Sequence, residues 1–162
     1  MTSNRTIRWV ALAIVLPLLG EQATAQSAIE HHVWEEGLTF RPYSRTAESI
    51  TGPIRISDRS VTFGRVSVPA RRIGRFWRDW AGDGSKHTAD VFKLSRDPGT
   101  LRNGNTLCGK GEVARYFVVW EALGISGALV ETAVWSSALP PTDINSEGLC
   151  ATLNYLQPTG HE

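Results

Sequence analysis

Arginines and tryptophans are interleaved in one stretch of the chain, Pro69 to Trp80 (PARRIGRFWRDW). Guanidinium groups bind carboxylates and phosphates through paired hydrogen bonds, and flat indole rings stack on sugars, bases and other rings. The stretch therefore predicts a surface that binds an anionic partner. The candidate ligand-binding residues are Arg71, Arg72, Arg75, Trp77, Arg78 and Trp80.

The same stretch also has a purely structural interpretation. An amphipathic strand or a turn of helix would bury the aromatic rings, and the arginines would pair with Glu112, Glu121 or Glu131. These carboxylates belong to an acidic part of the chain, because residues 103–162 carry 2 Lys/Arg against 6 Asp/Glu, whereas residues 53–102 carry 11 against 5. Attraction between the two parts within one fold is the simplest use of this asymmetry.

The sequence lacks the common catalytic motifs. It has no Gly-x-Ser-x-Gly nucleophile elbow, no phosphate-binding loop and no dinucleotide fingerprint. His87, close in sequence to Asp83 and Asp90, is a candidate half of an acid–base pair. The alternative is a surface histidine, because most of these have acidic neighbours by chance. We therefore expect a protein that is not an enzyme and that needs no cofactor.

Metal-binding patterns are weak as well. His31 and His32 are adjacent, so their side chains point apart on a strand or a helix, and no third ligand follows at a recognised spacing. Asp79, Asp83 and Asp90 do not have the alternate spacing of a calcium loop. We expect no metal site, with these histidines on the surface and these aspartates in solvated turns.

The first 25 residues have the pattern of a secretory signal peptide. Arg5 and Arg8 form a basic region, residues 9–20 are apolar, and Ala23–Ala25 is a small-x-small cleavage site. An apolar core of this length is shorter than the roughly 20 residues that span a bilayer. An uncut N-terminal anchor is the alternative. We expect a periplasmic or secreted protein that is cleaved near Ala25 and has no membrane span.

The composition of the chain after the signal peptide argues against binding to nucleic acid or a membrane, and it predicts a disulfide. Lys/Arg and Asp/Glu balance beyond residue 25, so no global field attracts nucleic acid or a membrane. Cys108 and Cys150 are the only cysteines, and two cysteines in an exported chain are expected to pair. The bridge would close a loop of about 43 residues, which contributes about 4 kcal/mol. Two free thiols are the alternative.

Apolar and polar residues alternate at period two along most of the chain from Leu38. Residues 113–123 are apolar on both faces in their middle, which is typical of a central strand or of a strand between a barrel interior and a covered outer face. Asn103-Gly104 predicts a two-residue hairpin turn. The expected strands cover residues 38–43, 50–57, 60–63, 66–68, 89–95, 113–123, 128–135 and 149–156.

About eight short strands without a long helical period predict an all-β fold. We expect a small antiparallel meander barrel, lipocalin-like, because sequential hairpins close naturally and a barrel leaves no strand edges. A β-sandwich is the alternative. The single domain covers residues 38–157, after a flexible lead-in (or short helix) over 26–37 and before a tail over 158–162.

A barrel of this kind also permits an internal ligand site. Five aromatic side chains are candidates for lining an apolar cup: Tyr116, Phe117, Trp120, Trp135 and Tyr155. The alternative is that the same side chains fill the barrel.

Four motifs carry a resemblance to known families: residues 50–54 (ITGPI), 103–109 (NGNTLCG), 116–120 (YFVVW) and 149–155 (LCATLNY). They resemble a family of small, exported, uncharacterised bacterial β-barrel proteins with one disulfide, and this resemblance implies export and a β-fold without an activity. A second similarity is to periplasmic inhibitors of c-type lysozyme, also small exported barrels with a disulfide near the barrel end. Their Ser-Gly-x-x-Tyr signature is only partly matched at Glu112–Tyr116, where the Ser and the Gly are missing.

The expected function is that of an exported, disulfide-stabilised, non-catalytic binding module. Its Arg/Trp stretch would bind an anionic component of the cell envelope, such as a cell-wall fragment, a lipid headgroup or an acidic protein. The alternatives are a barrel-interior binder of a small apolar ligand and a lysozyme-inhibitor-like protein. The oligomeric state has no sequence signature.

Overall fold

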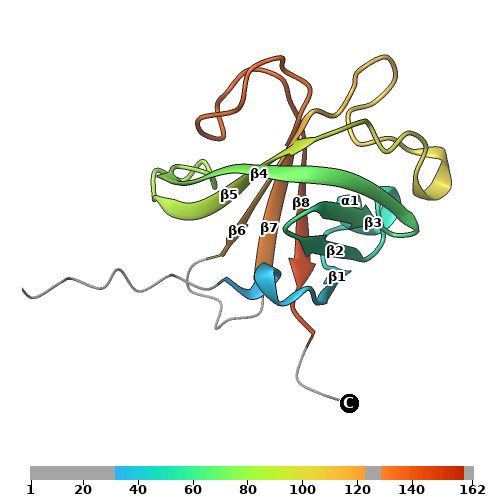
Figure 1. Cartoon of the computed structure of the whole chain (residues 1–162), viewed down its shortest axis with the longest axis horizontal. Helices are drawn as coiled ribbons and strands as arrows, with labels where there is room; N and C mark the ends of the chain where they lie inside the picture. Colours follow the sequence, from blue (N-terminus) through green and yellow to red (C-terminus); the bar gives the residue numbers. More distant parts are fainter. Residues whose placement is uncertain (1–31, 123–128, 159–162) are drawn as a thin grey trace, which may run out of the picture. The chain divides into compact units, whose positions relative to one another are not determined.

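Eight antiparallel strands close into a barrel in which every strand pairs with its neighbour in the sequence and β1 pairs with β8 (Figure 1). The computed structural model describes residues 32–122 and 129–158. The strands are β1 (Thr39–Pro42), β2 (Ile54–Ser57), β3 (Ser60–Phe63), β4 (Val66–Arg78), β5 (His87–Leu94), β6 (Tyr116–Glu121), β7 (Leu129–Trp135) and β8 (Leu149–Leu156). The predicted eight-stranded meander barrel is confirmed, and the sandwich alternative is wrong. The expected signal peptide, with residues 26–31 and 159–162, lies outside the described residues.

The structure also has three short helices: η1 (Val33–Glu36), α1 (Arg45–Ile50) and η2 (Arg102–Gly104). Of these, only a helix in the region of η1 was considered from the sequence. The described end of the lead-in forms the short helix η1, and Trp34 of this helix is buried. Helix α1 replaces the beginning of the strand expected over 50–57, since the Ser44 hydroxyl accepts a hydrogen bond from the Ala47 amide and caps the helix. The helix η2 replaces the expected two-residue hairpin at Asn103-Gly104.

The barrel interior is filled by side chains. Phe117 of β6 packs against Phe63 and Phe92, with ring centroids 5.6 and 6.4 Å apart. Tyr155 is also inside, and its hydroxyl lies 2.7 Å from that of Thr51. Burial inside the barrel raises the pKa of Tyr155 against a smaller opposing effect of this hydrogen bond. Phe117 and Tyr155, two of the candidates for lining a cup, thus pack with other side chains of the core.

A second apolar core covers the outer face of β5, β6 and β7. Trp80 and Trp135 pack edge to face there, with centroids 6.2 Å apart, and Ile144 of the β7–β8 connection packs against the same cluster. Tyr116 and Trp120 belong to this core, so the expectation that they and Trp135 line an internal cup is wrong. Strand β6 therefore has a barrel interior on one face and a covered outer face on the other, as its sequence predicted.

Strand β4 contains the irregularity that matters for the candidate site. It is 13 residues long and pairs with β5 as far as Arg78 opposite His87. Its register shifts between Arg72 and Gly74, which leaves Ile73 as an extra residue in a β-bulge. Residues three apart on a regular strand face opposite sides, but across this bulge Arg72 and Arg75 both reach the same carboxylate.

The expected disulfide is present. Cys108, in the segment before β6, is joined to Cys150 of β8. The same segment is tied to α1 because the side-chain amide Nδ2 of Asn105 donates to the Ser49 carbonyl at 2.9 Å. In Figure 1 the connections before β6 and before β8 lie at the end of the barrel away from η1. No helix among the described residues is long and apolar enough to cross a membrane.

Candidate functional site

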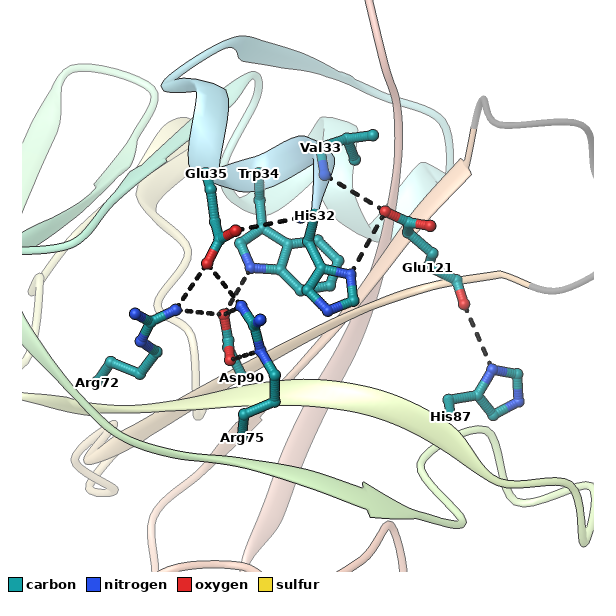
Figure 2. Close-up of polar contacts among 9 residues, drawn as sticks. All are labelled: His32, Val33, Trp34, Glu35, Arg72, Arg75, His87, Asp90 and Glu121. Carbon is teal, nitrogen blue, oxygen red and sulfur yellow. Dashed lines mark hydrogen bonds and ion pairs between the residues drawn. The ribbon is translucent and has the colours of Figure 1, made fainter. Parts of the chain in front are cut away.

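Two arginines of the predicted binding stretch belong to an ion-pair network beneath η1 (Figure 2). The Arg75 Nε and Nη2 donate to the two Asp90 carboxylate oxygens at 2.8 and 2.9 Å. Arg72 Nη1 donates to Asp90 Oδ2 at 3.1 Å and to Glu35 Oε1 at 2.7 Å. Arg75 Nη2 also donates to Glu35 Oε1, at 2.6 Å. Two cations and two carboxylates thus neutralise each other at this end of the barrel.

Asp90 is the centre of this network. It is fully buried, at 0% exposure, and its Oδ2 also accepts a hydrogen bond from the Trp34 indole at 2.9 Å. Burial raises the pKa of Asp90, but hydrogen bonds from Arg75 and Trp34 and the charge of Arg75 outweigh burial and lower it. Asp90 therefore stays ionised, and the expectation that it is a solvated turn residue is wrong.

The helix η1 is held over the barrel end by this network and by the histidine before it. The His32 ring stacks on the Trp34 indole, with centroids 4.3 Å apart and an interplanar angle of 2°. Glu121 Oε1 accepts a hydrogen bond from the Val33 amide at 3.3 Å and lies 3.7 Å from His32 Nδ1. His32 is buried, so its expected place on the surface is wrong.

The second expected surface histidine is also buried. His87 Nε2 lies 2.9 Å from the Ser85 hydroxyl and His87 Nδ1 lies 3.3 Å from the Glu121 carbonyl oxygen. Both ring nitrogens thus have partners within the protein. The carboxylates of Glu35 and Asp90 likewise have their hydrogen-bond partners within the protein. We therefore interpret the network as structural, with the role of fastening η1 to the barrel.

The structural alternative for the Arg/Trp stretch is thus correct for two arginines, with other partners than expected. Arg72 and Arg75 pair with Glu35 and Asp90, and neither Glu112, Glu121 nor Glu131 forms an ion pair with them in the described part of the chain. Trp80 also has a structural role. It is fully buried in the outer core, and its indole donates to the Phe76 carbonyl at 3.1 Å.

The other three candidates, Arg71, Trp77 and Arg78, are exposed, and β5 adds the cation Lys93 to them. Arg71 lies directly opposite Lys93 in the β4–β5 ladder, and both side chains are exposed. A shallow cleft of about 320 Å³ is lined by Pro69, Ala70 and Arg71 of β4 and by residues 93–95. Neither Arg71 nor Lys93 forms an ion pair with a described carboxylate. Like charges directly opposite each other on paired strands destabilise a sheet.

The far end of the hairpin presents an aromatic ring with cations beside it. The Trp77 side chain is 61% exposed, and Lys86 Nζ lies 5.1 Å from its ring centroid. Arg78 is exposed, and its Nη1 donates to the Trp77 carbonyl at 2.9 Å. Phe76 lies across Gly74, where a Cβ would come within 2.4 Å of the ring, so the glycine makes room for it.

We call these exposed residues the hairpin surface: Arg71, Trp77, Arg78, Lys86 and Lys93. The structure does not bring all five together, since Arg71 and Lys93 lie seven and six residues from Arg78 and His87, which end the ladder. Trp77 pairs with Thr88, which faces the opposite side of β5 from Lys93, so the hairpin surface includes both faces of the hairpin. Lys86 and Lys93 were missed because they lie outside the Arg/Trp stretch, Lys93 in the strand β5 that pairs with it and Lys86 directly before β5. The predicted strand over 89–95, paired with the Arg/Trp stretch, was the signal that could have found Lys93.

The connecting turn carries the nearest acidic groups, which are occupied by backbone amides. Asp79 accepts from the Gly82 amide at 2.7 Å, and Asp83 accepts from the Ser85 amide at 2.8 Å. Hydrogen bonds from the Ser85 hydroxyl and amide lower the pKa of Asp83. Four cations against these two carboxylates leave the hairpin surface positive.

One group of potential metal ligands lies elsewhere, at Cys108, Glu112 and Cys150. The two sulfurs are joined in the disulfide, so neither is a thiolate that could bind an ion. The described residues therefore offer no metal or cofactor site at this cluster.

Comparisons with known proteins give no family for this chain. Family models, curated proteins and solved structures were compared with it, and none of them matches. The resemblances drawn from the sequence motifs stay predictions. Function has to be inferred from the chain's own residues.

Proposed function

We propose that the protein is an exported, non-catalytic binding module that binds an anionic component of the cell envelope through the hairpin surface. The proposal narrows the sequence prediction. It keeps Arg71, Trp77 and Arg78 and adds Lys93 of the paired strand and Lys86, which directly precedes that strand. It leaves out Arg72, Arg75 and Trp80, whose charges and ring are used within the fold.

The observation that carries the proposal is the pair of exposed cations that face each other across β4 and β5. Arg71 and Lys93 are in register and have no carboxylate partner among the described residues. Their repulsion costs the isolated sheet stability, and a bound carboxylate or phosphate would relieve it. A guanidinium beside an ammonium matches an anion that accepts several hydrogen bonds.

Trp77 supports the same proposal at the end of the hairpin. A large ring exposed to 61% gains apolar contact and stacking when a partner covers it, and indole is enriched in binding interfaces. Lys86 and Arg78 beside the ring add attraction for an anion. A partner that combines negative charge with flat or apolar groups fits this end.

Export is supported by two independent features. The signal-peptide pattern of the first 25 residues predicts it, and a disulfide is expected to persist only in an oxidising compartment. An extracytoplasmic partner is therefore the consistent choice.

The test compares a hairpin-surface variant with a charge-matched control. The variant carries Arg71→Ser, Arg78→Ser, Lys86→Ser and Lys93→Ser. The control removes four exposed cations elsewhere, with Arg41→Ser, Arg59→Ser, Lys110→Ser and Arg115→Ser. Each chain, without residues 1–25, is immobilised and exposed to an envelope extract, to isolated cell-wall fragments and to vesicles containing an anionic phospholipid.

We expect the wild type to retain at least one of these components in a salt-sensitive manner, because exposed charges are screened at high ionic strength. The hairpin-surface variant should lose about tenfold or more of the binding, while the control retains it. Equal binding by the two variants would contradict the proposed surface. Absence of any captured component from the wild type would contradict the proposed function as a whole.

A further inference from the structure

A cleft of about 580 Å³ lies beside α1 and η2. It shares no residue with the hairpin surface, although Val66 of the cleft and Arg71 of the hairpin surface both belong to β4. Three segments form its walls: residues 51–53 after α1, the β3–β4 turn over residues 63–66, and residues 100–102 that lead into η2. Clefts of a few hundred cubic ångströms are the size that binds small organic molecules.

The inner wall of the cleft is apolar. Pro53, Val66 and Leu101 contribute to it, and Phe63, itself only 1% exposed, connects it to the barrel core. A ligand with an apolar body would bury surface against this wall, at about 25 cal/mol for each square ångström removed from water.

Two guanidinium groups line the same cleft. Arg65 and Arg102 are exposed, and no Asp or Glu is among the residues that line it. Neither arginine side chain forms an ion pair or a hydrogen bond with another described residue. An apolar wall with two unneutralised cations and no acid favours a ligand that is apolar at one end and anionic at the other.

The walls are fixed before a ligand arrives. The Gly64 amide donates to the Pro53 carbonyl at 2.8 Å, which docks the β3–β4 turn on the segment after α1. Gly64 has φ 58°, and a Cβ there would lie 2.6 Å from the Thr51 carbonyl oxygen, so this close approach requires glycine. The Thr51 hydroxyl is in turn bonded to the buried Tyr155 hydroxyl and to the Ala47 carbonyl.

The third wall is held in the same way. The Leu101 amide donates to the Asn105 carbonyl at 2.7 Å, and the Arg102 guanidinium lies against Gly52, 3.6 Å from where its Cβ would be. A preformed site binds with a smaller entropic cost than one that must be ordered by its ligand.

We infer that this cleft binds a small amphiphilic anion, with a carboxylate or phosphate head group between Arg65 and Arg102 and an apolar tail against Pro53, Val66 and Leu101. The inference is independent of the hairpin surface, since the two sites share no residue.

The test is a titration of the protein followed by amide chemical shifts in NMR. Octanoate and octyl phosphate carry both features of the ligand, acetate carries only the charge, and 1-octanol carries only the tail. We expect saturable shifts with octanoate or octyl phosphate at Gly52, Gly64 and Leu101, and at least tenfold weaker binding of acetate and 1-octanol. Preference for either head group supports the inference and identifies the group.

Two variants separate this site from general attraction for anions. Arg65→Gln with Arg102→Gln should weaken binding of the preferred probe by about tenfold or more, the range expected for hydrogen bonds between charged groups. Arg59→Gln with Arg115→Gln, which removes two exposed arginines elsewhere, should leave it unchanged. The hairpin-surface variant should also bind the probe normally, even if it loses its envelope partner.

The inference is overturned by an absence of saturable binding, by equal binding of 1-octanol, or by shifts that map to the hairpin surface. Equal affinity of the Arg65/Arg102 variant and its control also overturns it. Because all four substituted arginines are exposed, circular dichroism should show the same fold in each variant.

Discussion

Replacing Glu35 by Gln tests whether the ion-pair network fastens η1 to the barrel. Burial raises the pKa of Glu35, but hydrogen bonds from the His32 amide and from Arg72 and Arg75 lower it from 4.5 to about 2. At about 1.4 kcal/mol for each pH unit, this difference corresponds to at most about 3 kcal/mol of stability. The Glu35 side chain is 19% exposed and that of Arg72 is 38% exposed. Solvent screening therefore reduces the expected loss to about 1–2 kcal/mol at pH 7.

The sign of the pH dependence follows from the direction of the shift. The folded-state pKa of Glu35 is below the value in the unfolded chain, so the ionised carboxylate stabilises the fold above about pH 4.5. This contribution is lost as the pH falls from about 4.5 to about 2. The advantage of the wild type over Glu35→Gln should therefore shrink across that window and vanish at its lower end. Asp90, whose pKa is also lowered, contributes stability that is lost in the same direction. Because it shares Arg72 and Arg75 with Glu35, the difference between the two proteins measures Glu35 together with its coupling to Asp90.

The assay is urea unfolding followed by tryptophan fluorescence at pH 7, 5.5, 4 and 2.5. Glu147→Gln is the control, because Glu147 is exposed and has no ion pair within the described part of the chain. The control should change the free energy of unfolding by less than about 0.5 kcal/mol at every pH. The reasoning is refuted if Glu35→Gln is as stable as the wild type at pH 7. It is also refuted if a difference seen at pH 7 persists undiminished at pH 2.5.

Three further changes test other parts of the fold in the same unfolding assay. Removing the Cys108–Cys150 disulfide by serine substitution should lower the free energy of unfolding by about 4 kcal/mol, because the bridge joins residues 42 apart; a loss under about 1 kcal/mol would contradict a role for the bridge in folding. Trp80→Ala should cost about 3–5 kcal/mol, since the ring is fully buried, while Trp77→Ala should cost less than about 0.5; similar losses would contradict their assigned environments. Gly64→Ala should lower the free energy of unfolding more than Gly99→Ala. Both glycines have positive φ, but only at Gly64 would the new methyl group lie against a backbone oxygen; the reverse order would argue against this close approach.

The barrel was predictable because its signals are local. Alternation at period two specifies which residues of a strand share a face, whatever the strand pairs with. Phe117 and Val119 were therefore assigned to one face of β6 and Tyr116 and Val118 to the other, as found in the two cores. The same local pattern gave a wrong prediction at Ile50. Its alternation of apolar and polar residues predicted a strand, but Ile50 is the last residue of the six-residue helix α1, which Ser44 caps.

The partners of the arginines were not predictable from local pattern. Arg72 pairs with Glu35, which is 37 residues away, on a helix that the sequence left undecided. The bulge at Ile73 then decides that Arg72 and Arg75 face the same carboxylate, and a bulge has no firm sequence signature here. Two members of the candidate binding stretch thus became structural through contacts that only the three-dimensional fold defines.

Most cations of residues 53–102 lack an ion-pair partner in the described part of the chain. Residues 53–102 contain 11 Lys/Arg, and of these only Arg72 and Arg75 form ion pairs with carboxylates in the part of the chain that is described. The expected attraction between the basic part and the acidic part after residue 102 does not appear as ion pairs there. A surface that needed charge only for solubility would intersperse both signs. Four of the remaining cations lie on the hairpin surface and two line the cleft beside α1. The two proposals of external anions rest on these cations, which form no ion pair with a described carboxylate and lie beside an exposed indole or an apolar wall.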